Sequence, residues 1–334
     1  MSSSPRVIIY RYDASPYSIK VDNVLVLKKI PHQKVNVSPV LPRPEITDLL
    51  GVTYRRIPIL AIGNDVYCDT SLIVSALERR FPASAGYGTI FPQAKNGGGA
   101  VNGLAKASAN FFENALFPAA ANLLPWEKFP PAFIKDRSLL SGTTFRVEAI
   151  AASRETSLNT LSAHLSLLEE QFQDGREWLF DTELPSLTDI SIHFILNWVR
   201  ASRLGRPLVD ATNFPKTVKW LAHFSDYLER ERGGQAAAQQ ITGEEAAASI
   251  MASSFESYDV VGFNTTEAAR LALKLNEQVQ IAPDDTGRKY LTVGKLVGIN
   301  MEEVVIEVQG FQGLVRCHFP RLGFTLKAVR SHKL

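Results

Sequence analysis

Residues 7–21 of the chain read VIIYRYDASPYSIKV and contain a strand, a turn and the start of a helix. The apolar run at residues 7–10 is short and continuous, which is typical of a strand buried on both faces. Pro16 can occupy the first helical position, where its missing N–H costs nothing, and Ser15 before it can act as the N-cap. We therefore expect a buried strand followed directly by a helix that begins at Ser15.

Short elements continue to alternate after this segment, up to residue 81. Gly63 and Asn64 form a tight-turn signal between two short strands, and Pro58 lies near the entrance of the first of them. The expected elements are strands at residues 34–37, 57–60 and 66–68 and helices at about residues 16–30, 45–50 and 72–81. The order β-α-β-α-β-β-α predicts a small α/β domain over residues 1–82.

The middle of the chain is expected to be entirely helical. Residues 82–99 contain two prolines and five glycines, which predict a loop. Beyond it, apolar residues recur in steps of three and four over residues 158–172, which indicates one stripe of a long amphipathic helix. Ser186 and Asp189 have the spacing of a capping box at the start of another apolar helix. We predict an all-helical domain over residues 98–232.

The last part of the chain is expected to be rich in strands. Residues 233–257 are rich in Ala, Gln, Gly and Ser and predict a helical linker. After it come five short apolar runs, separated by turn signals such as residues 284–287. We predict a small β-barrel, SH3-like or OB-like, over residues 258–334. This is a fold analogy and indicates no function by itself.

Composition and charge argue against several classes of protein. The chain has 334 residues, 45% of them hydrophobic, and a net charge of +2, so we expect no nucleic-acid partner. Its two cysteines, Cys68 and Cys317, lie far apart, and no two histidines have i, i+4 spacing, so we expect neither a disulfide framework nor a metal site. Because we see no signal sequence and no apolar run of membrane-spanning length, we expect a soluble, cytoplasmic protein that binds no membrane.

Three short motifs add a resemblance to a known family. Residues 15–21 read SPYSIKV, residues 56–60 read RIPIL and residues 69–73 read DTSLI. Together with an α/β domain followed by an all-helical domain, these motifs resemble the serine-type members of the soluble glutathione transferase superfamily. The resemblance covers roughly residues 6–232, and the β-rich part that follows lies outside it. It implies that the α/β domain at residues 1–82 has a thioredoxin-like fold and binds glutathione.

The resemblance implies a glutathione site. Its catalytic residue is Ser15, whose hydroxyl would face the glutathione sulfur, and the proline of the second motif would be cis and would present backbone groups to the cysteinyl part. The third motif would hold the γ-glutamyl end, with Asp69 facing the ammonium group and the Thr70 hydroxyl facing the carboxylate. The residues implied to bind glutathione are Arg56, Ile57, Pro58, Asp69 and Thr70.

The chemistry of a thiol nucleophile requires these residue types. The thiolate is the nucleophile, whereas a free thiol has a pKa of about 8.5. A hydroxyl that donates to the sulfur favours the thiolate, and the N-terminus of the helix after Ser15 adds a favourable partial charge. Tyr10 or Tyr12 is an alternative donor. The sequence departs from the family at Gly51-Val52, which replaces Asn-Pro, and in the third motif, where Asp-Thr replaces Glu-Ser.

Two classes of function agree with these observations. The first is a glutathione-dependent enzyme that adds the thiolate to an apolar electrophilic small molecule, or that uses glutathione in an isomerisation or elimination. The second is a non-catalytic binding or regulatory protein that uses the β-rich domain to contact a partner. The resemblance also implies a homodimer. The aromatic residues that would face the second substrate are Phe111, Phe112, Phe117, Trp126 and Phe133.

Overall fold

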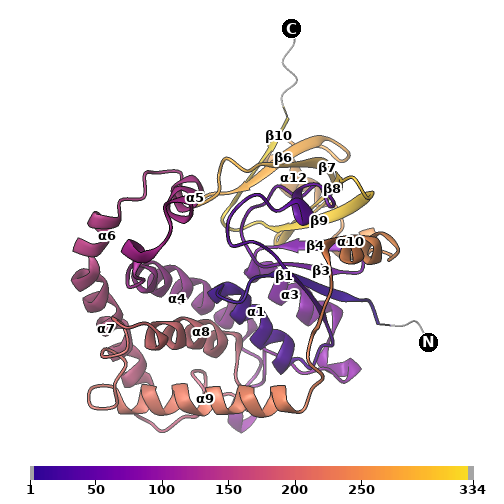
Figure 1. Cartoon of the computed structure of the whole chain (residues 1–334). Coiled ribbons are helices and arrows are strands. Elements are labelled where there is room, and N and C mark those ends of the chain that lie inside the picture. The colour runs from indigo at the N-terminus through magenta and orange to yellow at the C-terminus, as the bar shows by residue number, and fades with distance from the viewer. Residues whose placement is uncertain (1–3, 330–334) are drawn as a thin grey trace.

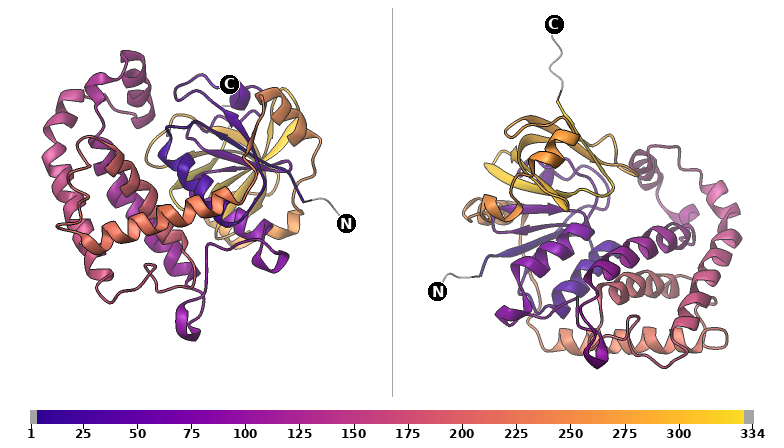
Figure 2. Two further views of the ribbon diagram at one scale, coloured as in Figure 1. Left: turned by 60° about the horizontal axis from the view of Figure 1, so that its bottom comes forward. Right: turned by 180° about the vertical axis from the view of Figure 1, so that it is seen from behind.

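The computed structural model describes residues 4–329 and shows three parts (Figure 1). An α/β layer at the N-terminus lies between a group of helices and a β-rich part. The view from behind shows the same arrangement, with the helices on one side of the layer and the C-terminal strands on the other (Figure 2). The last helix of the helical group is α9 (Pro215–Gly233). It passes beneath α1 (Pro16–Leu27) in Figure 1 before the chain returns to the sheet.

The N-terminal layer has the predicted β-α-β-α-β-β-α order. The first strand pairs in parallel with the second and antiparallel with the third, which pairs antiparallel with the fourth. The first strand is buried throughout, as its continuous apolar run predicted. The bounds are β1 Val7–Arg11, α1 Pro16–Leu27, β2 Gln33–Asn36, α2 Pro44–Thr47, β3 Ile59–Ile62, β4 Asp65–Cys68 and α3 Thr70–Arg80.

Each face of this sheet has its own hydrophobic core. Ile9 of β1 packs on the face that α1 and α3 cover, in a core shared with the helical domain. Its neighbours Ile8 and Tyr10 pack on the other face, in a core shared with the C-terminal strands. Because successive side chains of a strand point to opposite faces, β1 supplies both cores at once.

The middle of the chain is helical, as predicted. The expected capping box forms at α8, where Asp189 Oδ2 accepts from the Ser186 backbone N–H (2.9 Å) and hydroxyl (2.6 Å). No helix within residues 4–329 has the length and apolar character needed to cross a bilayer. The bounds are α4 Asn102–Asn122, α5 Pro131–Ser141, α6 Val147–Ala152, α7 Arg154–Gln171, α8 Leu187–Ala201 and α9 Pro215–Gly233.

The C-terminal part is rich in strands, as predicted, but its described strands lie in an open sheet, so the structure does not show the closed barrel that we also predicted. In the described part of the chain they extend the N-terminal sheet into one open sheet of ten strands, in the order β10-β6-β7-β8-β9-β4-β3-β1-β2-β5. A barrel closes by pairing its own edge strands, whereas here β9 pairs in parallel with the free edge of β4. The bounds are α11 Tyr258–Val261, α12 Thr265–Arg270, β6 Gln278–Pro283, β7 Thr292–Ile299, β8 Glu303–Gln309, β9 Leu314–Pro320 and β10 Phe324–Ala328.

The segment that links the helical domain to these strands is itself part of the sheet and its cover. Its strand β5 (Gln239–Gln240) pairs in parallel with β2 at the other edge of the N-terminal sheet. Its helix α10 (Gly243–Met251) begins with a capping box of Thr242 and Glu245 and buries one apolar face in the second core. Both edges of the N-terminal sheet are therefore paired, which removes exposed strand edges.

A buried cluster of charges lies at the β4–β9 junction. The His318 ring contacts Asp65 Oδ1 through Nε2 (3.2 Å) and Glu303 Oε2 through Nδ1 (3.0 Å). Asp65 also pairs with Arg80 at 2.9 Å, and Glu303 pairs with Arg79 at 2.9 Å. Both carboxylates thus have at least two cationic partners, since Arg316 also lies 4.0 Å from Asp65, and these partners offset the cost of burying their charges.

These contacts set the protonation state of the cluster. Burial alone lowers the pKa of His318, but its hydrogen bonds to Asp65 and Glu303 and their charges outweigh burial, so the pKa of His318 is raised above 6.5. Burial alone raises the pKa of Asp65, but its contact with His318 outweighs burial and lowers that pKa. The cluster is therefore most stable when the His318 imidazole is protonated and Asp65 is ionised.

We expect His318→Gln to lower the free energy of unfolding by about 3 kcal/mol near pH 6, because two buried carboxylates lose a shared cation. A raised folded-state pKa contributes stability that is complete below the unfolded pKa of about 6.5 and is lost as the pH rises through the folded pKa. The stability deficit of the variant should therefore shrink as the pH rises above about 6.5. Urea unfolding at several pH values measures this change.

The matched control is His223→Gln, which makes the same change at a partly exposed histidine of α9. This control should lower stability by less than about 1 kcal/mol. A His318→Gln deficit that grows toward alkaline pH would contradict the assignment of a protonated, doubly bonded imidazole.

Candidate functional site

The three motifs singled out in the sequence lie close together at the ends of adjacent strands of the N-terminal sheet. Ile59 of β3 pairs with Tyr10 of β1 and with Cys68 of β4. Pro58, Asp69 and the turn after β1 therefore lie at the same end of three adjacent strands. The helices α1 and α3 also begin at this end of the strands, and helix N-termini favour negatively charged groups.

Ser15 caps α1 as the sequence predicted. Its Oγ accepts a hydrogen bond from the Ser18 backbone N–H at 3.2 Å, and Pro16 fills the first helical position. In the part of the chain that the structure describes, this Oγ acts only as an acceptor, so its own proton is available for another group. Ser15 is 2% exposed, which places the hydroxyl beneath the molecular surface.

The peptide bond between Ile57 and Pro58 is cis, as the resemblance implied. Pro58 is buried at the entrance of β3, and Ile57 is partly buried against the second core. Pairing with β1 and β4 begins at Ile59, so the backbone N–H and C=O of Ile57 lie outside the strand ladder.

Asp69 has an uncommon backbone conformation, with φ 76° and ψ 136°. Its Oδ1 caps α3 by accepting from the Ser71 backbone N–H (3.0 Å) and hydroxyl (2.6 Å). Within residues 4–329, its Oδ2 makes only longer contacts, to the Tyr54 hydroxyl (3.4 Å) and to an Arg56 guanidinium nitrogen (3.8 Å). Backbone strain of this kind costs about 1–3 kcal/mol and concentrates at functional sites.

Thr70 contacts a buried ion pair that the sequence analysis missed. Lys20 Nζ donates to Thr70 Oγ1 at 3.1 Å and pairs with Glu113 of α4 at 2.6 Å. The Lys20 side chain is 2% exposed, so the pair is inside the protein. Because Oγ1 accepts from Lys20, the Thr70 hydroxyl proton is directed to another acceptor, and the positive charge behind it favours an anionic one.

Arg56 links the site to the C-terminal part of the chain. Its guanidinium forms an ion pair with Asp285 and donates to the Thr286 carbonyl oxygen at 2.7 Å. Both partners lie in the loop between β6 and β7, which the sequence indicated only as a turn. Since 229 positions separate Arg56 from Asp285, no local sequence signal could have found this contact.

Aromatic rings lie beside the start of α1. Tyr17 packs against Phe117 (ring centroids 4.8 Å apart) and Phe194 (5.3 Å), and Phe117 stacks on Trp198 with 8° between the ring planes. Tyr17 was part of the first motif, but the sequence analysis gave it no role. Of the five aromatic residues predicted for this region, Phe117 joins the cluster. The others make different ring contacts: Phe111, Phe112, Trp126 and Phe133.

Tyr10 and Tyr12, the alternative donors, lie on the other side of the sheet from α1. Tyr10 is buried in the second core, where burial raises the pKa of its hydroxyl, and Tyr12 packs against the same core. Cys68 lies there too, and burial raises the pKa of its thiol, which makes it unreactive. Of the three hydroxyls considered, only that of Ser15 is at the start of α1.

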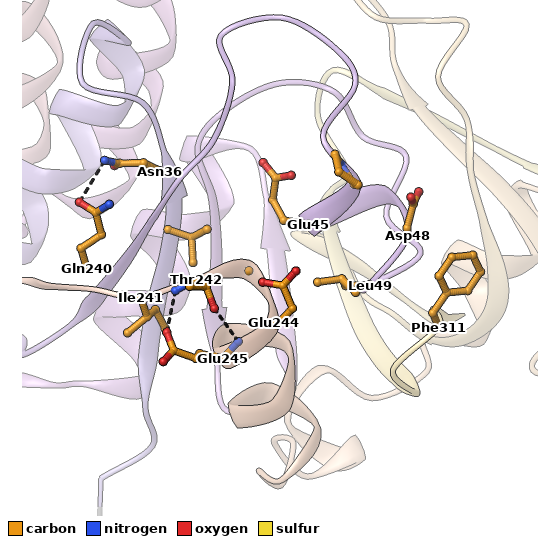
Figure 3. A pocket seen from close by; sticks show the side chains of 13 residues that line it. Asn36, Glu45, Asp48, Leu49, Gln240, Ile241, Thr242, Glu244, Glu245 and Phe311 are labelled. Atoms are coloured by element: carbon orange, nitrogen blue, oxygen red, sulfur yellow. Dashed lines mark hydrogen bonds between the residues drawn. The ribbon is translucent and has the colours of Figure 1, made fainter.

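A separate groove of about 620 Å³ lies between α2, β2 and α10 (Figure 3). Glu45, Asp48 and Glu244 contribute carboxylates to it, and Phe311 lies at one end. None of the residues predicted to bind glutathione lines this groove. Within residues 4–329, no three potential metal-ligating side chains gather in one place.

Comparison with protein families matches two parts of the chain. Residues 9–85 match the family described as the glutathione S-transferase N-terminal domain. Residues 114–232, which make up most of the helical domain, match a domain of unknown function (DUF7962). The first match covers the α/β layer that carries all three motifs.

Comparison with individual proteins supports the same fold. A GST-like protein from Pseudomonas syringae is 23% identical, with a TM-score of 0.68 over 97% of this chain and 100% of that one. The beta-etherase LigF from Sphingobium sp. is 14% identical, with a TM-score of 0.50 over 69% of this chain and 99% of that one. Prostaglandin E synthase 2 of Danio rerio is 36% identical over 74 residues, which are 22% of this chain and only 19% of that protein.

The resemblance stated from the motifs is therefore confirmed. The fold likeness extends over nearly the whole chain, including the C-terminal strands that the resemblance did not cover. Residues 9–85 therefore carry a glutathione S-transferase N-terminal domain, and the chain as a whole shares the fold of the GST-like protein.

Proposed function

We propose that the protein is a glutathione-transferase-like enzyme that ionises the glutathione thiol and presents the thiolate to an apolar, electrophilic small molecule. The observation that carries the proposal is the hydroxyl of Ser15, which lies at the N-terminus of α1 with its proton uncommitted within the described residues. The reaction is addition of the thiolate to the electrophile, or an isomerisation or elimination that returns glutathione.

Ser15 acts as a hydrogen-bond donor to the sulfur. A hydrogen bond to a charged group is worth about 1.5–3 kcal/mol, which corresponds to a decrease of about 1–2 units in the thiol pKa. The N-terminus of α1 adds a partial positive charge in the same place. The serine keeps its proton throughout, and the sulfur lone pair forms the new bond to the electrophile.

The other motif residues fit the peptide part of glutathione. The backbone of Ile57, which lies outside the strand ladder, pairs with the cysteinyl backbone. The Thr70 hydroxyl, with Lys20 behind it, donates to the γ-glutamyl carboxylate. Asp69 Oδ2, which makes only long contacts among the described residues, faces the γ-glutamyl ammonium group. Arg56 places its guanidinium beside this end of the ligand.

The aromatic cluster of Tyr17, Phe117 and Trp198 supports an apolar second substrate. These rings lie beside the start of α1, where the thiolate would form. Aromatic side chains provide large apolar contact areas with little loss of conformational freedom. A homodimer and a cytoplasmic location stay predictions.

A non-catalytic binding protein is the second candidate, and the burial of Ser15 favours it. A site that is closed over its donor hydroxyl can hold a tripeptide without admitting an electrophile. The pKa of the bound thiol separates the two candidates, because only the enzyme needs to lower it.

We expect the thiol of bound glutathione to titrate below its free pKa of about 8.5 in the wild type, and about 1–2 units higher in Ser15→Ala. The ultraviolet absorbance of the thiolate, recorded against pH with the protein in excess, measures both values. Buried Cys68 does not interfere, because burial raises its own pKa. Conjugation of glutathione to chlorodinitrobenzene should slow in parallel.

Ser18→Ala is the matched control, because it removes a buried hydroxyl from the same turn of α1 and keeps that of Ser15. It should leave the thiol pKa unchanged. A wild-type protein that binds glutathione with an unshifted thiol pKa would support the binding protein over the enzyme.

The strained conformation of Asp69 yields a second prediction. Both Asp69→Gly and Asp69→Ala lose the side-chain cap of α3, but glycine caps helices better than alanine and adopts a positive φ without strain. Asp69→Gly should therefore be more stable than Asp69→Ala by about 1 kcal/mol or more, as measured by urea unfolding. Both variants should lose affinity for glutathione.

The matched pair is Ser71→Gly and Ser71→Ala, within the first turn of α3. At this position we expect the ordinary order, in which the glycine variant is less stable than the alanine variant by about 0.5–1 kcal/mol. The same order at position 69 would show that Asp69 carries no strain.

A further inference from the structure

The β6–β7 loop, residues 284–291, spans the junction between the N-terminal layer and the helical domain. The Gly287 N–H donates to the Leu140 carbonyl oxygen at the end of α5 (2.7 Å). On the other side, the Tyr290 ring lies 4.5 Å from the guanidinium carbon of Arg55. The loop is therefore attached to both domains that form the proposed site, although it comes from neither.

The position of this loop is fixed at several points. The Thr53 hydroxyl donates to the Leu291 carbonyl oxygen at 2.6 Å, and the Asp284 N–H donates to the Gly323 carbonyl oxygen at 2.8 Å. Gly287 has φ +78°, and a Cβ there would stand 3.4 Å from the Arg55 side chain. These anchors hold Asp285, which lies between them, in a defined place.

Asp285 shares one cation with Asp69. The Arg56 guanidinium pairs with Asp285 and lies 3.8 Å from Asp69 Oδ2. Two carboxylates and one guanidinium carry a formal charge of −1, so this group of three side chains is suited to a second cation. The Asp285 side chain is 65% exposed, and an exposed ion pair contributes little free energy, so Asp285 can exchange partners at low cost.

The negative charge of Asp285 also affects the buried hydroxyl of Tyr17, beside the start of α1. Burial raises the pKa of Tyr17, and the negative charges of Glu113, Asp69 and Asp285 raise it further, while Arg56 opposes them. Tyr17 is the second helical residue after Ser15. Asp285 is thus electrostatically coupled to the start of α1 as well as to Asp69.

We infer that Asp285 is a ligand-binding residue of the glutathione site and that, with Asp69, it forms a two-carboxylate subsite for the α-ammonium group of the γ-glutamyl end. The inference rests on the proposed function and adds to it a residue from the C-terminal part of the chain. Without ligand, Arg56 is the one cation that forms an ion pair with both carboxylates among the described residues, and Arg288 donates only to the Asp285 backbone carbonyl oxygen. With ligand, the ammonium group joins Arg56 as a second cation for the two carboxylates.

The test compares two ligands by titration calorimetry on the full-length protein. One is glutathione, and the other is glutaryl-cysteinylglycine, which keeps the terminal carboxylate but has hydrogen in place of the α-ammonium group. Asp285→Asn should lower the affinity for glutathione about tenfold, which corresponds to the loss of about 1.4 kcal/mol of binding free energy from a charged hydrogen bond. The same variant should leave the affinity for the glutaryl analogue unchanged.

Asp284→Asn is the matched control, because it removes the same charge one position away. Asp284 Oδ1 accepts from Thr325, not from Arg56, so this variant should bind both ligands like the wild type. Any change in affinity that this control variant shows measures what negative charge in the loop contributes to binding in general.

The outcomes separate this inference from the proposed function. Wild-type protein that binds no glutathione would overturn both. Wild-type binding that Asp285→Asn leaves unchanged would overturn the inference alone, as would an equal loss for the two ligands, which indicates a structural role for the loop. Tighter binding by Asp285→Asn would also overturn it, because the loop would then obstruct the site.

Discussion

The parallel pairing of β9 with β4 determines where the whole C-terminal part of the chain lies. An unpaired β4 edge would expose backbone N–H and C=O groups, and pairing with β9 satisfies them. The pairing also joins the other four C-terminal strands, β8, β7, β6 and β10, to the sheet. Backbone pairing alone would tolerate a shifted register, but the charges restrict it. His318 meets both Asp65 and Glu303 in the observed alignment, and a shift would take away the imidazole that these two buried carboxylates share.

Local signals explain why so much of the fold could be predicted. The N-terminal order of elements, the capping box at Ser186 and the motifs around Ser15, Pro58 and Asp69 each depend on residues close in sequence. Their conformations follow from short-range constraints: proline at a helix start, a side-chain oxygen on a free N–H, an apolar run between turns. The motif residues lie at the same end of three adjacent strands, but the sequence analysis predicted only the order of these strands, and their pairing is seen in the structure.

The parts that could not be predicted all depend on contacts between distant segments. Strand count suggested a barrel, but it could not show that β9 would pair with another domain. The Lys20–Glu113 pair joins α1 to α4, and each residue alone looks like an ordinary charged helical position. The turn containing Asp285 carried a correct local prediction, yet its location over Arg56 follows only from the β4–β9 junction.

If Asp285 contacts the ligand, the junction and the site are thermodynamically coupled. A ligand that binds only when the C-terminal strands are docked stabilises the docked arrangement, and a weaker junction lowers the affinity for that ligand in proportion to the fraction of molecules that stay docked. Raising the pH has two opposite effects on such a protein. It removes the contribution of protonated His318 to the junction, whereas it favours ionisation of the glutathione thiol. The two protons therefore act on affinity in opposite directions, because a site that lowers the thiol pKa binds the thiolate more tightly, while a junction that loses the His318 proton is weaker.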